Sequence, residues 1–335
     1  MVGTGSSTYL YYGRQFRHPS VQKDPVYAHN EYIQLLAEYG ILGIAALVMF
    51  IETHLRRSWN FLLSNLSGEW TTSAAPHNTL ALTVGAFSAA AAVLSHAFME
   101  YNLHMPATLL VVACIFGLLV IPGDVAGACD EEEQGNLPPW ILLLLPLFAL
   151  WLGIRALPTL PAEILAEKAQ RTLTDPNVMS TPAIPKAVES LARQGMTYDP
   201  RNPELYFLIG DAKMASAWQT EDPTEKSSLI AEALNAYEQA LSLAPGDVRL
   251  VLCVGRAADQ IRDFGKAESA FELALKLDPL SSIVNFTYAT HLEARNKLPE
   301  ALEYYAKSLR LGQGPAAQEA LDRLRAALVQ PPAAR

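Results

Sequence analysis

The stretches AYEQALSLAP at 236–245, AFELALKLDP at 270–279 and YYAKSLRLGQ at 304–313 recur every 34 residues in the C-terminal half of the chain. Each copy carries a small residue and an aromatic ring in register, which are Ala233, Ala267 and Ala301, and Tyr237, Phe271 and Tyr305. A period of 34 residues fits two antiparallel helices with their turns, and a stack of such pairs buries one continuous core. The pattern therefore predicts a stack of paired helices, closed by a capping helix over 315–328.

These copies resemble tetratricopeptide repeats, in which small residues lie where the paired helices touch and an aromatic ring fills the gap. An earlier copy ends at LARQGMTYDP, 191–200, and lies 45 residues before the next because QTEDPTEKSS, 219–228, lengthens the interval. The resemblance implies that residues 159–335 form a helical solenoid that binds a peptide or partner protein. We expect His291 to lie on the surface of this solenoid.

The first half of the chain is apolar and predicts membrane-spanning helices. Four stretches stand out, 32–51, 78–99, 106–121 and 139–157. A helix needs about 20 apolar residues, within a range of about 17 to 25, to cross a bilayer core, so three of them qualify and 106–121 is marginal. The expected fold is all-α, with an external loop over 1–31, a bundle of four spans over 32–158 and the solenoid after it. The lipid bilayer is then one partner of the chain.

Composition and charge narrow the function further. Half of the 335 residues are hydrophobic, 18% are charged and the formal net charge is −9. This composition excludes a disordered chain, and the negative charge leaves no basic patch that could neutralise a run of phosphates in a nucleic acid. Cys114, Cys129 and Cys253 are widely spaced, without the pairing of a disulfide framework or the spacing of a zinc site. We expect no metal, no cofactor and no nucleic-acid partner.

Several polar side chains lie in or beside the expected spans. Glu31, Gln34 and Glu38 share one helical face by their i, i+3 and i+7 spacing. A carboxylate at the bilayer centre costs about 2.5 to 3.5 kcal/mol on insertion scales, so such a stripe faces a protein interior or a wet cavity, or else it snorkels at the interface. His96 and Glu100 are four residues apart, which favours a hydrogen bond between them over a metal site because Pro106 interrupts the helix.

A second resemblance involves four motifs in the first 121 residues: GTGSSTY at 3–9, AHNEY at 28–32, LLAEYGILG at 35–43 and SHAFMEYNLHMPA at 95–107. In this order they resemble the O-antigen ligase and polymerase superfamily. The resemblance implies a membrane glycosyltransferase of the bacterial cell envelope, with a role such as lipopolysaccharide biosynthesis. Such an enzyme moves a glycan from undecaprenyl pyrophosphate to a lipid A core, another glycan or a protein hydroxyl.

The resemblance also implies roles for individual residues. The family's functional histidine matches His29, which would orient or deprotonate the acceptor hydroxyl, because imidazole titrates near neutrality. The other residues implied at the site are the catalytic Glu38 and the substrate-binding Arg14, Arg17, Asn30, Glu100 and His104. Arginine can hold two phosphate oxygens of the leaving group at once. In the alternative interpretation, Arg14 and Arg17 are ordinary loop charges, His29 has a packing or capping role, and Asn30 caps the following helix.

The chain departs from this superfamily in one respect, since its members have about ten or more spans. Met1 lies two residues before Gly3, so we expect an N-terminally truncated transferase. The alternative is a catalytically inactive, membrane-anchored scaffold whose repeats bind other proteins. The family's topology implies a protein of the bacterial cytoplasmic membrane, with the His29 loop and the repeats outside the cytoplasm and the acidic run 130–133 inside.

Overall fold

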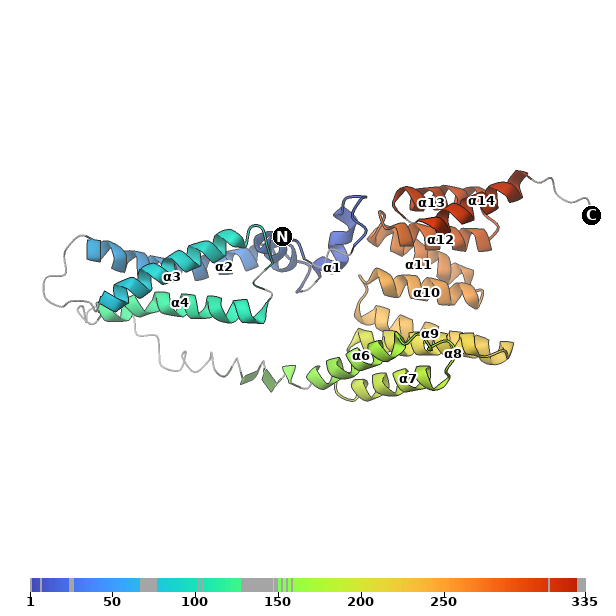
Figure 1. Cartoon of the computed structure of the whole chain (residues 1–335), viewed down its shortest axis with the longest axis horizontal. Helices are drawn as coiled ribbons and strands as arrows, with labels where there is room; N and C mark the ends of the chain where they lie inside the picture. The colour runs from blue at the N-terminus through green and yellow to red at the C-terminus, as the bar shows by residue number, and fades with distance from the viewer. Residues whose placement is uncertain are drawn as a thin grey trace, which may run out of the picture. The chain divides into compact units, whose positions relative to one another are not determined.

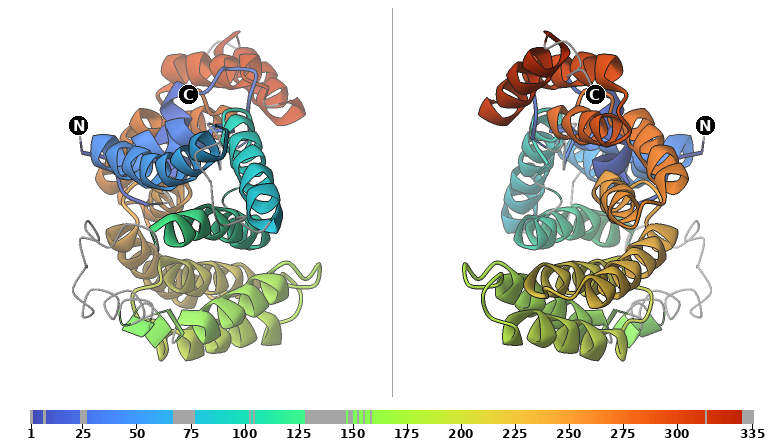
Figure 2. Two further views of the ribbon diagram at one scale, coloured as in Figure 1. Left: turned by 90° about the vertical axis from the view of Figure 1, so that its left-hand side faces the viewer. Right: turned by 90° about the vertical axis from the view of Figure 1, so that its right-hand side faces the viewer.

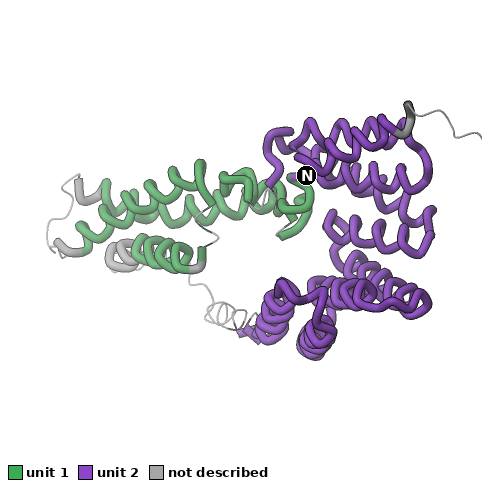
Figure 3. Tube along the Cα trace, turned by 45° about the vertical axis from the view of Figure 1, so that its right-hand side comes forward, with its two compact units in different colours: residues 1–13, 24–139 green, residues 14–23, 140–335 purple. Residues whose placement is uncertain are grey.

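The computed structural model describes residues 2–6, 8–23, 27–66, 77–101, 103, 105–127, 147, 150–151, 153–154, 156–157, 159–312 and 314–329. These residues form helices, turns and loops, and none of them lies in a strand, as the expected all-α fold requires. The chain divides into two compact units (Figure 3). Unit 1 comprises residues 1–13 and 24–139, and unit 2 comprises residues 14–23 and 140–335.

Unit 2 contains the repeats as paired helices (Figure 1). The pairs are α6 (Thr159–Leu173) with α7 (Ala183–Met196), α8 (Pro203–Gln219) with α9 (Pro223–Leu243), α10 (Val248–Gln260) with α11 (Phe264–Leu277), and α12 (Ser282–Ala294) with α13 (Leu298–Arg310). α14 (Pro315–Val329) follows the last pair, where the capping helix is expected. The side chains that accept a hydrogen bond from a first-turn N–H are Asn202, Asp222, Asp247, Asp263 and Ser281. These N-caps explain why the helices begin where they do.

The pairs α8/α9 and α10/α11 are each closed by a contact between a small residue and an aromatic ring, as the sequence pattern predicts. Phe271 on α11 is buried against Gly255 on α10, where an added Cβ would lie 2.6 Å from the ring. Tyr237 occupies the same place opposite Gly210. Tyr237 and Phe271 both belong to one hydrophobic cluster of buried side chains, which extends from α8 to α14. The prediction of a helical-repeat solenoid is confirmed, and both views of Figure 2 show its helices packed in successive pairs.

The inserted residues 219–228 lengthen the two helices of the copy that ends at 236–245. α8 has 17 residues against 13 in α10, and α9 has 21 against 14 in α11. Together these differences account for the 11 residues by which this copy exceeds the 34-residue period. The longer helices carry Trp218 into the last turn of α8, where the shorter α10 has no counterpart.

Unit 1 contains α1 (Tyr9–Tyr12), α2 (Glu31–Leu66), α3 (His77–His96) and α4 (Pro106–Gly127). Among the described residues two helices, Glu31–Leu63 and Thr79–His96, are long and apolar enough to cross a membrane by length and composition, and the apolar helix Ala107–Val120 is shorter. The bundle of four spans is thus not confirmed, because the fourth expected span, 139–157, lies largely outside the described residues. The second span also ends earlier than expected, at His96 instead of residue 99.

Helix α2 is interrupted at Gly40, whose backbone has φ 66° and ψ −160°. This left-handed region favours glycine because a Cβ is disfavoured there. The break leaves backbone carbonyls of the preceding turn without their usual partners, and the N-terminal Gly-x-Gly loop satisfies them. The Thr4 N–H donates to the Ala37 carbonyl (3.0 Å) and the Gly5 N–H to the Glu38 carbonyl (2.8 Å). A Cβ on Gly3 would overlap the Glu38 backbone, so only glycine fits there.

Candidate functional site

Two loops of unit 1 that are far apart in the sequence meet at one end of α2 and α3. The Glu31 N–H donates to the Ala97 carbonyl (2.9 Å), and the Leu103 N–H donates to Glu31 Oε1 (2.9 Å). Two aromatic pairs support the junction, Tyr32 with Phe98 at 4.4 Å and Tyr27 with Tyr101 at 4.5 Å between ring centroids. Residues 27–32, 97–101 and 103 therefore form one surface, which we call the two-loop site.

The two-loop site brings two of the expected site residues together. His29 Nδ1 lies 4.0 Å from Glu100 Oε2, and the imidazole packs edge-on against Tyr101 with centroids 4.9 Å apart. Both polar side chains are open to solvent, at 68% and 46% exposure, so their mutual attraction is weak. His29 also has a positive φ of 50°, which is uncommon outside glycine and presents the imidazole at a sharp bend of the chain.

Asn30 has a structural role at this site. Its Oδ1 accepts from the Ile33 N–H (3.0 Å), which caps α2, and its Nδ2 donates to the Phe98 carbonyl (3.0 Å). This capping role agrees with the alternative interpretation of the sequence, in which Asn30 caps the following helix and does not bind substrate. The remaining residue of the expected set in this region, His104, lies outside the described residues.

The polar stripe Glu31, Gln34 and Glu38 is buried. Glu38 Oε1 accepts from the Tyr9 N–H (3.3 Å) and from Gln34 Nε2 (3.4 Å). With Tyr39 and the apolar side chain of Leu109, the stripe lines a cavity of about 410 Å³. The sequence left open whether this stripe faces the protein interior or snorkels at the membrane interface. In the structure it faces the interior and a cavity.

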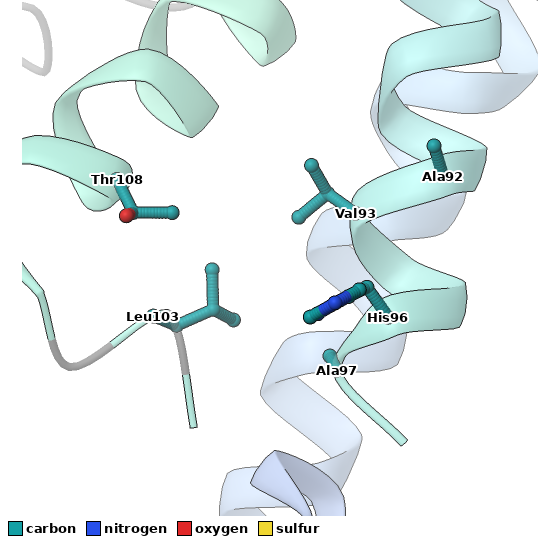
Figure 4. A pocket seen from close by; sticks show the side chains of 6 residues that line it. All are labelled: Ala92, Val93, His96, Ala97, Leu103 and Thr108. Atoms are coloured by element: carbon teal, nitrogen blue, oxygen red, sulfur yellow. The ribbon is translucent and has the colours of Figure 1, made fainter. Parts of the chain in front are cut away.

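A second, smaller cavity of about 240 Å³ lies between the end of α3 and the start of α4 (Figure 4). Its walls are Ala92, Val93, His96 and Ala97 on one side and Leu103 and Thr108 on the other. The helix ends at His96, so Glu100 lies beyond the part of the chain where i, i+4 spacing sets its position. Glu100 Oε2 lies 4.0 Å from His29 Nδ1, and the hydrogen bond between His96 and Glu100 stays a prediction.

The two arginines expected to bind the pyrophosphate lie in unit 2 and are buried. Arg14 is 1% exposed. Arg17 forms an ion pair with Asp278, in which Nη2 and Oδ1 are 2.9 Å apart and both side chains are 3% exposed. A role for Arg17 in holding a substrate would require this pair to open. Sequence reasoning had no means of finding Asp278, because it follows Arg17 by 261 residues.

The repeats carry a hollow of about 330 Å³ between α8, α9 and α10, which we call the repeat hollow. Its lining residues are Asp211, Met214, Trp218, Tyr237, Cys253, Arg256 and Gln260. Three of them follow i, i+3 and i+7 spacing on α8 and three do so on α10, and this repeated stripe is a signal that could have found the hollow from the sequence. We did not single out Trp218 or Arg256 in the sequence.

The wall of the repeat hollow combines an aromatic surface with positive charge. The Trp218 side chain is 52% exposed, and Lys226 Nζ lies 4.4 Å from the centre of its ring. Arg256 is exposed and its Nη2 donates to Cys253 Sγ at 3.4 Å, a weak acceptor. An indole face and guanidinium N–H groups are the groups that protein interfaces use most to bind a partner.

The floor of the hollow is a buried hydrogen bond. The Tyr237 hydroxyl donates to Asp211 Oδ1 at 2.6 Å. Burial raises the pKa of the Asp211 carboxyl above its ordinary value and also raises the pKa of the Tyr237 hydroxyl. Burial raises the pKa of the Cys253 thiol to about 11, so it stays protonated near neutrality and does not act as a nucleophile. The hollow is therefore equipped for binding and has no activated nucleophile in Cys253.

His291 corrects a further expectation. It is 1% exposed, and its Nδ1 lies 2.7 Å from Asp259 Oδ1 on the neighbouring helix α10. The imidazole also packs against the Phe271 ring, with centroids 5.1 Å apart. The prediction of a surface position was wrong because the contact with α10 depends on how successive helix pairs stack. In the parts of the chain that the structure describes, no group of three His, Cys, Asp or Glu side chains could hold a metal ion.

Comparison with known proteins adds little to this geometry. No family model matches the chain. A 151-residue stretch is 29% identical to the general transcriptional corepressor ssn6 of Schizosaccharomyces pombe, which covers 45% of this chain and 13% of that protein. Among solved structures, a thermophilic TPR protein of Thermus thermophilus aligns with 56% of this chain and 96% of its own, at 20% identity and a TM-score of 0.39.

The paired helices, their 34-residue period and the glycine–aromatic contact make the repeats tetratricopeptide-like. Neither similar protein belongs to the O-antigen ligase and polymerase superfamily by its name. The chain spans only a small part of the curated relative that it matches.

Proposed function

We propose that the chain is a membrane-anchored scaffold whose tetratricopeptide-like repeats bind a segment of a partner protein. The observation that carries this proposal is the repeat hollow, which is lined by the half-exposed Trp218 ring from α8 and the exposed Arg256 guanidinium from α10. The partner supplies an apolar or aromatic side chain for the indole face and a hydrogen-bond acceptor for the guanidinium. This function needs no catalytic group, and the buried, protonated Cys253 thiol is consistent with that.

The anchor in this proposal is the apolar surface of unit 1. Large apolar side chains on α2 and α4 are exposed, among them Leu42 at 74% and Leu110 at 69%. Large exposed apolar surface marks a membrane or protein contact, and α2 and α3 are long enough to cross a bilayer. We assign this surface to lipid and place the protein in the bacterial cytoplasmic membrane, with the repeats outside the cytoplasm.

A photo-crosslinking experiment tests the scaffold function. A benzophenone side chain replaces Gln260 in the repeat hollow or, as the control, the exposed Glu272 on α11, in the full chain within native membranes. We expect a discrete cross-linked partner from position 260 and none from position 272. Trp218→Ala and Arg256→Ala should each weaken the cross-link by about tenfold, as truncation of an interface anchor does. Equal labelling from both positions, or labelling that both substitutions leave intact, contradicts the proposal.

A second candidate function is the glycan transfer implied by the motifs of the first 121 residues. Its support is the two-loop site, where His29 and Glu100 are 4.0 Å apart and exposed. In this reaction an acceptor hydroxyl attacks the anomeric carbon and the pyrophosphate carrier leaves. His29 would take the hydroxyl proton. Glu31 and Glu38, which line the cavity of about 410 Å³, would orient the acceptor or the sugar. The carrier-linked glycan is then the substrate, and the acceptor is a lipid A core, a glycan or a protein.

A transfer assay with the full-length protein decides on this second candidate. His29→Ala should lower the rate of glycan transfer from the lipid carrier by about 10²- to 10⁴-fold, the usual contribution of a general base. The control is His54→Ala, which removes a histidine from α2, 23 residues after the start of the helix at Glu31. Transfer that His29→Ala leaves unchanged removes His29 from the mechanism, and no transfer by the unaltered protein favours the scaffold.

A further inference from the structure

Residues 17–22 form a tight turn that lies against the repeats. We call this segment the docking turn and its contact surface, Asp278 to Ser282 between α11 and α12, the docking corner. The turn and the corner belong to the same compact unit, although about 260 residues separate them. Among the described residues the contact includes one ion pair and two hydrogen bonds, which involve the side chains of Arg17 and Gln22.

The ion pair lies between Arg17 and Asp278. Nη2 and Oδ1 are 2.9 Å apart and each side chain is 3% exposed. Asp278 lies at the C-terminal end of α11, where its N–H bonds to the Ala274 carbonyl. A charge that is buried to this extent is strongly unfavourable without its partner. The corner therefore requires a cation at this place.

Gln22 makes the two hydrogen bonds. Its Nε2 donates to the Leu280 carbonyl (3.1 Å), and its Oε1 accepts from the Ser282 N–H (2.9 Å). Ser282 is the first residue of α12, and the N–H groups of a first helical turn have no partner within the helix. Ser281 caps the Val284 N–H with its own side chain (3.2 Å). The Gln22 amide thus completes the start of α12.

The docking turn is held in shape by its own hydrogen bonds. The Val21 N–H donates to the His18 carbonyl (2.9 Å), and Gln22 Nε2 donates to the Pro19 carbonyl (2.7 Å). Arg17 Nη1 donates to the Gln22 carbonyl (3.4 Å). These bonds place the Arg17 and Gln22 side chains side by side, so little further ordering is needed when the turn binds.

We propose that the docking corner is a second peptide-binding site of the repeats, separate from the repeat hollow, and that the docking turn of the same chain is its ligand. The site recognises a tight turn that presents an arginine and a glutamine five residues apart. The corner binds the same sequence as a separate peptide when its own turn no longer occupies it. While the turn is docked, a separate peptide is excluded, because a tethered ligand competes at an effective concentration of about millimolar.

Binding of a labelled peptide with the sequence of residues 14–23, RQFRHPSVQK, tests this proposal. The full chain in detergent is compared with the variant Arg17→Ala/Gln22→Ala, whose turn has lost both contacts, and with the same variant carrying Asp278→Ala as well. We expect the double variant to bind the peptide at least about tenfold more tightly than the unaltered chain. The triple variant should bind it as weakly as the unaltered chain. Equal binding by all three proteins, or binding that Asp278→Ala leaves intact, overturns the proposal.

Hydrogen exchange gives a second readout that does not depend on peptide binding. Gln22→Ala, which keeps the ion pair, should raise the exchange rate of the Ser282 N–H at least about tenfold, because this N–H loses its acceptor. The Val284 N–H, capped by Ser281, is the control in the same helical turn and should keep its rate. An unchanged rate at Ser282 means that the turn does not occupy the corner, and this overturns the proposal. Neither measurement involves the repeat hollow, so their outcome is independent of the scaffold function.

Discussion

Phe271→Ala is expected to lower the free energy of unfolding of the repeat unit by about 3–5 kcal/mol, the cost of removing a fully buried aromatic ring. The Phe271 ring is 1% exposed, and it contacts Gly255 on α10 and the Tyr288 and His291 rings on α12. It therefore joins one helix pair to the next, and replacement by alanine leaves a cavity between the two pairs. Pulse proteolysis of the full chain in a urea series measures the loss as a lower midpoint.

Leu273→Ala provides the matched control for Phe271→Ala. Leu273 lies two residues further along α11 and its side chain is 38% exposed, so the two changes share a helix and differ in burial. We expect the control to cost about 1 kcal/mol or less, because it removes little buried area. A similar midpoint for both variants would show that the contact between successive pairs does not hold the repeats together.

His291→Ala is expected to cost about 3 kcal/mol. Removal of one partner typically costs about 3–5 kcal/mol for a buried ion pair and about 1–3 kcal/mol for a buried hydrogen bond, and the Asp259 side chain is 19% exposed. The loss should appear as faster hydrogen exchange in α10 and α12 together, since the His291–Asp259 contact joins these two helices.

Thr290→Ala is the control for His291→Ala, because Thr290 is the exposed neighbour on the same helix. It should change the free energy of unfolding by no more than about 0.5 kcal/mol, as surface substitutions do. If His291 lay on the surface, as predicted from the sequence, His291→Ala and Thr290→Ala would both change the free energy of unfolding by the same small amount. The comparison therefore distinguishes the stacked arrangement of the pairs from a looser one.

Much of the repeat architecture could be predicted from the sequence. The 34-residue period locates Tyr237, Phe271 and Tyr305, and all three are buried in the core of the repeats. Small residues opposite the rings follow from the same period. This part of the fold depends on contacts within one helix pair, and such contacts repeat wherever the sequence repeats.

The candidate sites were predictable only in part. The motif around His29 is visible in the sequence, and so is the capping role open to Asn30. The burial of Arg17 was not, because its carboxylate partner Asp278 lies in a different part of the chain. Trp218 was missed as well, because its exposure results from the added turn of α8 and not from the period itself.

The sequence by itself determined the local structure: which segments are helices, where Asn202, Asp247 and Ser281 start them, and which residues meet within a pair. Periodicity and capping act over a few residues, so they can be recognised without coordinates. The tertiary structure alone decided the pairings between distant residues, of Arg17 with Asp278, His291 with Asp259 and His29 with Glu100. These pairings form because the packing of separate segments brings polar groups together and buries some of them, and a buried polar group needs a partner. No local sequence pattern encodes how the segments pack.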